Sequence, residues 1–500
     1  MRETLKRLAR FTAGYSLSAL IGPLFTLLLT PLYTRALEPA DYGVVDVLMT
    51  LSALLVAISM LGMDQALSAH FFDKGDTAEA DAWRRNLTTT ALMVVTGVAI
   101  VAALGLALFA EPLAAQLFHD PARRVTVLLV AVNVAFLPVY NLTIHALRLR
   151  MQIARANAVS LTYLFTLIGA AVTMVLGLRM RATGIVAANA LASVAASVIG
   201  IVLAAGPLRG RPSPALGRSL LGVGIGVLPG ALGMLIFTNI DRPLLTQFVS
   251  AADVGLYSIA NKLASMVFVA MSPIFAAWWP IALEMAGRPE ASRQFPRFFE
   301  YFLSAGFMLA LGIGLFAPEI LQVFARDAYV PAAPYALALM AYNGPIGFAF
   351  ALLQIGLVSR KRTGLTSLAF LVSATTNITL NLILMPRLGV WGAVWATLAA
   401  GMVQTVLLFR FAQSVYPIRY RWLRVLALFG GYGVITAAFL LTPAPWSFWA
   451  RALAIGLMAA LIILVGVATP RQIVDGVGML RRYAIRLLGR PASFDGREQH

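Results

Sequence analysis

Ionisable residues stand at a few places in an otherwise apolar sequence. The stretch NIDRPLLTQFVSAADVGLYSIANKL (239–263) follows a long apolar run and places Asp241 directly before Arg242. Lys262, beside Asn261, lies inside the next apolar run. An arginine stays ionised and its planar fork can bind an anion through two charge-assisted hydrogen bonds. A lysine inside an apolar run is costly and usually faces a bundle interior or water. These cations are therefore candidates for an anion-binding site.

Other charged residues stand near the ends of apolar runs. Arg35 ends the first long run, and Asp46 and Asp64 lie near the two ends of the second. Both carboxylates are candidates for coupling to an ion. A plainer interpretation is that Arg35 and Arg242 reach to water at a membrane interface. Asp64 would then be a solvated helix end, and Asp241 would cap the loop or neutralise its neighbour.

Five asparagines are candidates to line a polar path, namely Asn133, Asn141, Asn239, Asn377 and Asn381. The same amides could instead hydrogen-bond across helices and hold them together. His145 could titrate near neutral pH, although a lone histidine more often has a structural partner. The four histidines are scattered, cysteine is absent and no cluster of Asp, Glu and His stands out in the sequence. The sequence therefore predicts neither a catalytic nor a metal centre.

These residues are set in a chain with the composition of a membrane protein. Of its 500 residues, 60% are hydrophobic and 12% are charged, and the mean hydropathy is +0.83. Apolar stretches of roughly 20 residues, long enough to cross a bilayer as helices, recur along the whole chain. We place about fourteen of them, from 11–34 to 449–468. The predicted fold class is an all-α integral membrane protein.

The basic residues predict the orientation in the membrane. The net charge is +18, and most Lys and Arg fall in loops on one side of the predicted spans. Such loops stay in the cytoplasm, so we expect a bacterial inner-membrane protein with both termini inside and no nucleic-acid partner. The basic start MRETLKRLAR leads into a run too long for a signal peptide, which predicts a retained first helix. The basic segment 471–490 is expected to lie on the anionic inner leaflet.

A weak internal repeat divides the spans into two halves. Four residues recur at a constant offset of about 212 residues: Thr34, Ala40, Asp41 and Gly43 match Thr246, Ala252, Asp253 and Gly255. The offset corresponds to six spans, so both copies enter the membrane in the same direction, related by an axis near the membrane normal. We expect an N-lobe over 1–210 and a C-lobe over 211–412 around a central cavity. Two further spans over 413–470 and a cytoplasmic tail over 471–500 would follow.

Three stretches resemble a known family: PLYTRALEPADYG (31–43), LGMDQALSAHFF (61–72) and the segment 239–263 quoted above. They are similar to the Wzx-type polysaccharide and O-antigen flippases of the multidrug, oligosaccharidyl-lipid and polysaccharide exporter superfamily. The Asp-Arg pair, followed about 13 residues later by Gly-x-Tyr, is the most specific element. The resemblance covers roughly the whole chain. It implies two six-helix lobes, alternating access and transfer of an undecaprenyl-pyrophosphate-linked oligosaccharide to the outer leaflet.

The resemblance also gives the candidate residues their roles. Arg242, Arg35 and Lys262 with Asn261 would engage the pyrophosphate of the cargo. An H⁺ or Na⁺ gradient would drive the cycle, with the three aspartates named above as coupling candidates and the five asparagines along the sugar path. No other cofactor is expected. The expected partners are the lipid-linked oligosaccharide, membrane lipids and the polysaccharide polymerase machinery.

Two alternatives stay within the same superfamily, a lipid II flippase and a cation-coupled drug exporter. A more remote one is an integral-membrane polysaccharide polymerase or ligase. Such enzymes usually expose a sizeable loop with catalytic side chains, and the longest predicted loops here, around 70–86 and 281–298, are short. We therefore expect a transporter rather than an enzyme.

Overall fold

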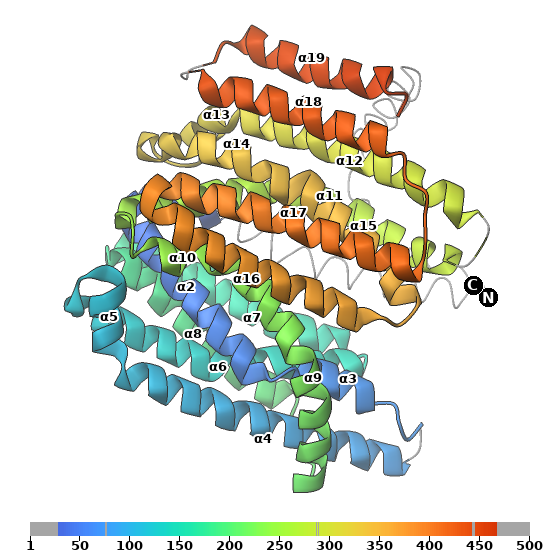
Figure 1. Ribbon diagram of the computed structural model, residues 1–500. Helices are drawn as coiled ribbons and strands as arrows, with labels where there is room; N and C mark the ends of the chain where they lie inside the picture. Colours follow the sequence, from blue (N-terminus) through green and yellow to red (C-terminus); the bar gives the residue numbers. More distant parts are fainter. Residues whose placement is uncertain (1–28, 76–77, 287, 289, 443–445, 468–500) are drawn as a thin grey trace, which may run out of the picture.

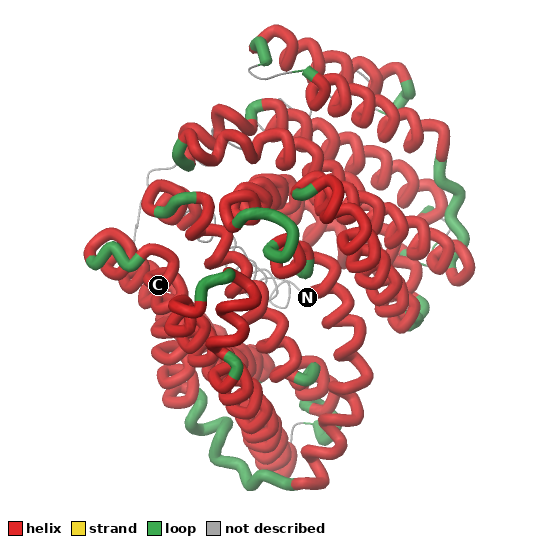
Figure 2. Tube along the Cα trace, turned by 60° about the vertical axis from the view of Figure 1, so that its left-hand side comes forward, coloured by secondary structure: helices red, strands yellow, loops and turns green. Residues whose placement is uncertain are grey.

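The computed structural model describes residues 29–75, 78–286, 288, 290–442 and 446–467. Every regular element in these ranges is helical, and the helices are joined by short loops (Figure 2). Most of the first predicted span, 11–34, and the whole tail over 471–500 lie outside the described residues. The predicted all-α class is confirmed.

The helices of the first half run from α2 to α8. Their bounds are α2 Pro39–Met60, α3 Met63–His70, α4 Ala78–Leu108, α5 Ala110–Phe118, α6 Arg124–Leu149, α7 Ile153–Ala171 and α8 Arg181–Leu203. A short 3-10 turn, η1 (Pro121–Arg123), precedes α6, and a π-helical turn, η2 (Val172–Gly177), extends α7.

The second half runs from α9 to α17 and is followed by two further helices. Their bounds are α9 Pro214–Asn239, α10 Asp241–Leu245, α11 Ala251–Met285, α12 Ala291–Leu315, α13 Ala317–Phe324, η3 Asp327–Ala332, α14 Ala333–Ala341, η4 Tyr342–Ile346, α15 Gly347–Ser359, α16 Thr363–Leu388, α17 Val390–Val415, α18 Trp422–Leu441 and α19 Phe448–Leu464.

Local sequence sets several helix starts. Proline occupies the first turn of α2 and of α9, where its missing N–H costs no hydrogen bond. The Ser250 hydroxyl caps α11 by accepting the Asp253 N–H at 3.2 Å, and Ser447 caps α19 in the same way. These caps satisfy backbone donors that the first turn of a helix leaves unpaired.

Eleven helices of the described chain are long and apolar enough to cross a membrane. The predicted span 332–358 is divided into α14, η4 and α15, with Pro345 inside the π-helical turn. The predicted span 449–468 corresponds to α19, a shorter apolar helix of 17 residues. The chain is a multi-pass membrane protein, and the number fourteen stays a prediction.

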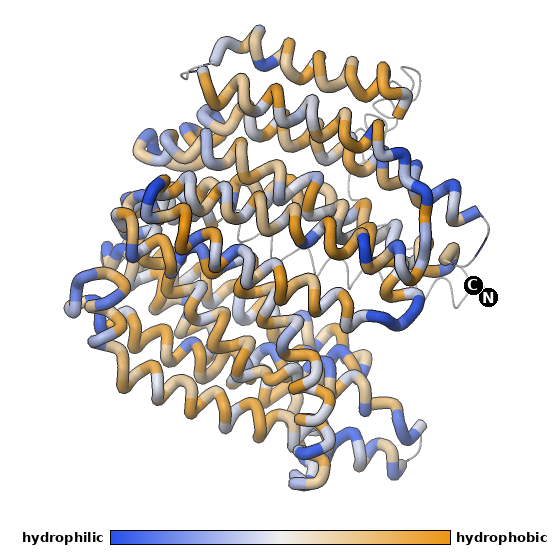
Figure 3. Tube along the Cα trace, in the orientation of Figure 1, coloured by the Kyte–Doolittle hydropathy of each residue, from blue (hydrophilic) through white to orange (hydrophobic). Residues whose placement is uncertain are grey.

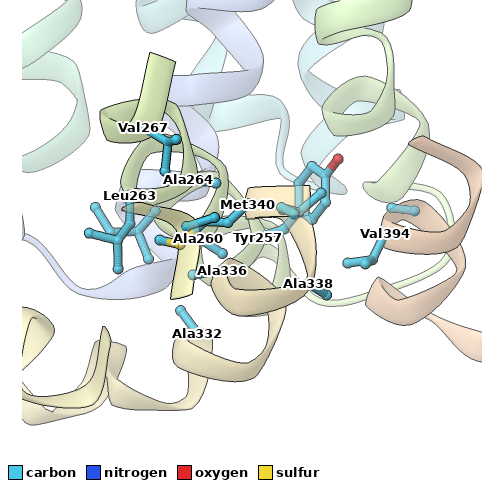
Figure 4. Close-up of a cluster of buried hydrophobic side chains, with 14 of the residues drawn as sticks. Tyr257, Ala260, Leu263, Ala264, Val267, Ala332, Ala336, Ala338, Met340 and Val394 are labelled. Atoms are coloured by element: carbon cyan, nitrogen blue, oxygen red, sulfur yellow. The ribbon is translucent and has the colours of Figure 1, made fainter. Parts of the chain in front are cut away.

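The long helices pack in two groups (Figure 1). We call α2 together with α4 to α8 the N-lobe, and α11 together with α12 and α14 to α17 the C-lobe, because helices within each group pack on one another. The α11 to α14 contact is built from small side chains such as Ala260, Ala264 and Ala336, which let the helices approach closely (Figure 4). The C-lobe core therefore depends on close backbone packing.

The two lobes meet where α2 lies along α11. Gly43 of α2 and Gly255 of α11, the glycines matched by the internal repeat, contact each other's helix backbones here. A Cβ on Gly43 would collide with the Ala251 carbonyl oxygen, and one on Gly255 with the Pro39 carbonyl oxygen. Only glycine permits this separation, so the close approach of α2 and α11 depends on both glycines.

Helix α9 packs on both lobes. Its first half lies on the N-lobe, where Leu220 joins the core formed by Met63 and Leu67 and Gly224 lies against the backbone of Gly62. Gly62 has a positive φ of +66° and ends α2 before α3 begins. Beyond Pro229, α9 instead packs on α16 of the C-lobe. A single helix thus connects the two lobes.

Helices α18 and α19 lie on the outer side of the C-lobe, at the top of Figure 1. Three ion pairs among the described residues hold them. Arg451 of α19 is 3% exposed and lies 2.5 Å from Glu319 of α13. Glu300 of α12, also 3% exposed, lies 3.2 Å from Arg424 and 3.6 Å from Arg421. Removing one partner of such a buried pair would leave an uncompensated charge.

The bundle has two distinct ends in Figure 1. We call the left end, with α5, α10 and α13, the α10 end, and the right end, with α3 and the start of α4, the α3 end. Figure 3 shows hydrophobic residues along the helices between them and hydrophilic residues in the loops of the α3 end. This distribution fits a protein that crosses a bilayer along the long helices.

Candidate functional site

Arg242 of α10 connects the two lobes through a buried ion pair. Its Nε lies 2.6 Å from Asp46 Oδ2 of α2, and the residue is 9% exposed. The N–H does not point along this contact, so charge rather than a directed hydrogen bond joins the pair. Nη1 donates to Asn239 Oδ1 at 3.0 Å and to the Thr238 carbonyl at 3.2 Å. The fork of Arg242 is therefore held in place from α9.

Asp241 points into the C-lobe and does not neutralise Arg242. Its Oδ2 accepts from the Tyr257 hydroxyl at 2.6 Å and from the Thr397 hydroxyl at 2.8 Å, and its Oδ1 accepts from Asn381 Nδ2 at 2.7 Å. Asn381 Nδ2 also donates to Asn377 Oδ1 at 3.0 Å. Asp241 is 2% exposed and forms no ion pair with any described residue. Three neutral donors thus hold the Asp241 carboxylate, at the edge of the pocket that Arg242 also lines.

Lys262 of α11 supplies a second cation near Arg242. Its Nζ donates to the Tyr42 hydroxyl of α2 at 3.1 Å and lies 5.6 Å from the centre of that ring. Both cations line a cavity of about 250 Å³, together with Asp46, Asp241 and Asn261. We call this cavity the cation pocket. It lies between α2, α9, α10 and α11, on the interface between the lobes.

A larger cavity, of about 740 Å³, lies further toward the α3 end. Asp64, Asn141 and His145 line it together with Tyr140 and Tyr163 of α6 and α7. His145 Nε2 shares a hydrogen bond of 2.8 Å with the Ser68 hydroxyl. Most of the remaining wall is apolar. We call this space the larger cavity.

The structure brings most candidate residues together and separates a few from them. Asn239 holds Arg242, and Asn377 and Asn381 lie behind Asp241. Arg35 is exposed and donates to the Val323 carbonyl at 2.8 Å, outside both cavities. Asn133 is buried and donates to Ser52 Oγ at 3.1 Å within the N-lobe. Asn133 therefore forms a hydrogen bond between two helices, which is the second of the two roles that the sequence allows for the asparagines.

Three residues of this site escaped the analysis of the sequence. Tyr42 and Tyr257 both lie in the stretches that carry the family resemblance, and Tyr257 is the tyrosine of the Gly-x-Tyr element. Figure 4 shows the ring of Tyr257 beside the alanines of α11 and α14, with its oxygen directed away from them. Thr397 has no signal in the sequence, because only folding brings α17 next to α10.

No group of three or more His, Cys, Asp or Glu side chains that could hold a metal ion forms among the described residues. The arrangement can instead do two things. The cation pocket can bind an anion, and the oxygen-rich surroundings of Asp241 can bind a proton or a hard cation.

The fold defines the class of protein. The structure resembles a lipid II flippase MurJ in an inward closed conformation with a TM-score of 0.69, 13% identity, and 92% of this chain and 99% of that chain covered. It also resembles a multidrug resistance MATE family transporter in an inward-facing conformation, with a TM-score of 0.63, 13% identity, and coverage of 78% and 94%. The chain has the fold of the multidrug, oligosaccharidyl-lipid and polysaccharide exporter superfamily.

The sequence places the chain within that superfamily. A family described as "Polysaccharide biosynthesis protein" matches residues 8–286, more than half of the chain. The chain belongs to this family. A curated relative, the probable low-salt glycan biosynthesis flippase Agl15 of Haloferax volcanii, is 21% identical over 219 residues, which are 43% of this chain and 46% of the relative. The match thus spans about half the length of that relative.

Proposed function

We propose that this protein is a flippase that moves an undecaprenyl-pyrophosphate-linked oligosaccharide from the cytoplasmic to the outer leaflet by alternating access. The observation that carries the proposal is the cation pocket, which places Arg242 and Lys262 together on the interface between the lobes. Ionisable residues inside a membrane bundle are costly and mark substrate pathways. A pyrophosphate is an anion that both an arginine fork and a lysine point charge can bind.

The contacts of the two cations support an anionic cargo. Arg242 has one charged partner, Asp46, whose side chain is 28% exposed and so remains open to exchange. Lys262 has the neutral Tyr42 hydroxyl as its hydrogen-bond partner. A pyrophosphate entering the pocket would replace Asp46 as the charged partner of the arginine and would also bring negative charge next to Lys262. The low dielectric of the interior strengthens both contacts.

Asp241 is the residue to which we propose that the coupling ion binds. With Asp46 and Asp241 ionised, the four charged side chains of the pocket cancel, and the pocket has no net attraction for an anion. A proton or Na⁺ on Asp241 would leave one positive charge in excess. The Asn381 Oδ1 atom is buried with no hydrogen-bond partner, and together with the hydroxyls of Tyr257 and Thr397 it offers oxygen ligands of the kind that hard cations prefer. Binding of an ion at Asp241 would thus change the net charge of the pocket, and this change would link the ion to the binding and release of the cargo.

Contacts at the α10 end support the direction of transport. The glycine contact between α2 and α11, the Arg242 to Asp46 pair and the Tyr329 hydroxyl bond to the Leu37 carbonyl join the lobes there. The larger cavity lies on the other side of these contacts, toward the basic loops of the α3 end. We infer that the α3 end is cytoplasmic and that cargo enters from it. Opening of the α10 end would then release the cargo outside.

Cells that lack the protein provide the test. Lipid-linked oligosaccharide should accumulate on the cytoplasmic face, and the wild type should restore its transfer. Arg242→Ala and Lys262→Ala, present at wild-type levels in the membrane, should fail to do so. Normal transfer without the protein would contradict the proposal, and a loss of lipid II transfer or of drug export would favour one of the two sister functions of the superfamily.

A further inference from the structure

The two cavities follow one another along the same two helices. Asp46 of α2 and Thr238 of α9 line the cation pocket, whereas Val56 of α2 and Ala231 of α9 line the larger cavity. With a rise of 1.5 Å per residue, these wall positions are about 10 to 15 Å apart along the helices. A molecule whose pyrophosphate is bound in the cation pocket can therefore reach the larger cavity with the next group of its head.

An aromatic pair forms one wall of the larger cavity. Tyr140 of α6 and Tyr163 of α7 are stacked, with ring centres 4.9 Å apart and planes inclined by 26°. Both are half-buried and both line the cavity. The Tyr163 hydroxyl donates to Asn189 Oδ1 of α8 at 3.3 Å, which fixes its ring against the N-lobe. Because the rings stack on one another, each has only its outer face and its edge left for the cavity, and together they form a rigid apolar wall with polar tips.

Hydrogen-bonding groups lie at the edge of this surface. Asn141 is exposed to the cavity beside Tyr140, and His145 follows one turn later on the same helix. Leu228 and Leu235 of α9 give another part of the cavity lining an apolar character. A binding site of this kind, with apolar faces and a few placed polar groups, suits a flat ligand that has an apolar face and a polar edge. A pyranose ring has this form, with C–H groups on its face and hydroxyls around its edge.

We propose that Tyr140 and Tyr163 form a sugar-ring subsite that takes a pyranose of the oligosaccharide head while the pyrophosphate binds at Arg242 and Lys262. This inference rests on the proposed function and adds to it the residues that recognise the sugar. The cation pocket recognises what all lipid-linked precursors share. The aromatic pair recognises what distinguishes a glycosylated precursor from the bare lipid.

The test compares two probes that share the tail and the pyrophosphate. One is undecaprenyl pyrophosphate, and the other is the lipid-linked oligosaccharide extracted from the source cells. Binding of each is measured on the full chain in nanodiscs. Tyr140→Leu and Tyr163→Leu are expected to weaken binding of the sugar-bearing probe about tenfold and to leave the bare lipid unchanged. Tyr140→Phe keeps the ring and should bind both probes as the wild type does. Tyr301→Leu, at an exposed position of α12, is the matched control.

The possible results distinguish failure of the sugar-ring subsite from failure of the proposed function. Equal losses for both probes, or no loss for either, would overturn the subsite while leaving the flippase proposal in place. A wild-type protein that binds neither probe would contradict the proposed function and remove the basis of the subsite. If the leucine variants melt below the wild type, a benzophenone amino acid at Asn141 replaces them. Crosslinking of the sugar portion to this position supports the subsite, and its absence overturns it.

Discussion

The cation pocket and the larger cavity share α2 and α9 as walls but differ in chemistry. The cation pocket is small and contains two carboxylates and two cations within about 250 Å³. The larger cavity has about three times that volume and a mostly aromatic and aliphatic wall, with its ionisable groups toward the α3 end. The contrast separates two tasks. In the function that we propose, charge would bind the shared pyrophosphate and respond to the coupling ion, whereas shape and aromatic surface would respond to the variable sugar.

Among the substitutions considered, removing Arg242 should reduce transport the most. Arg242→Ala deletes the fork that would bind the pyrophosphate and leaves Asp46 unpaired. Hydrogen bonds to charged groups contribute about 1.5 to 3 kcal/mol each, so transport in proteoliposomes should fall about 100-fold. Arg242→Lys keeps the positive charge but loses the planar guanidinium group, so transport by this variant should fall about tenfold. Wild-type transport by the alanine variant would show that the pocket does not bind the cargo.

Neutralising Asp241 should break the response to the coupling ion. Asp241→Asn keeps the side-chain size and removes the charge, so transport should lose its dependence on the Na⁺ or proton gradient and fall about 30-fold. Because Asp241 accepts three hydrogen bonds in a buried site and the amide nitrogen of asparagine cannot accept one, the free energy of unfolding should also fall by about 1 to 3 kcal/mol, so transport is compared at equal amounts of folded protein. Asp253→Asn, in the first turn of α11 and outside the lining of the cation pocket, is the control and should keep its gradient dependence. Retained coupling in the Asp241 variant would place the ion elsewhere.

Adding a methyl group at the interface between the lobes should lower the stability of the protein. Gly255→Ala places a Cβ against the Pro39 carbonyl, and overpacking of this kind costs about 1 to 3 kcal/mol. Gly97→Ala is the matched control, since a Cβ there meets no atom within 4 Å, and an alanine inside a helix should stabilise it by up to about 1 kcal/mol. Thermal melting measures both. Equal melting temperatures would mean that the lobes do not meet as closely as the glycine pair indicates.

Lys262 should contribute less than Arg242. Its single ammonium cannot chelate a pyrophosphate as a fork does, so Lys262→Gln should reduce transport about five- to tenfold. Lys361→Gln, in an exposed loop of the α3 end, serves as the control and should be neutral. A loss larger than that of Arg242→Ala would reverse the order of the two cations.

Arg35 should contribute least. The sequence suggests it as a cavity cation, but it is exposed and bonded to a backbone carbonyl of α13. Because a single exposed contact contributes little, Arg35→Ala should change transport by less than about twofold. A tenfold loss in the same proteoliposome assay would mean that Arg35 enters the pathway in another state of the cycle.

How far the site could be predicted from the sequence depends on the residue. Asp241, Arg242 and Lys262 were recognisable because a charge inside an apolar run is expensive and therefore seldom without a function. Their partners were not. Arg242 pairs with Asp46, nearly 200 residues away, rather than with the adjacent aspartate. Adjacent side chains on a helix point in different directions, so nearness in sequence does not imply a shared pair.

The sequence by itself determined the class of the fold. Apolar runs of membrane-spanning length leave helices as the structure that satisfies the backbone in lipid, and the repeat predicted two lobes whose matching glycines meet. Only the tertiary structure decided which face each helix presents. It directed Asp241 to neutral hydroxyls, Arg242 to the other lobe, and Tyr140 onto Tyr163. Hydropathy follows burial in lipid or protein alike, so it carries no information about which buried side chains meet.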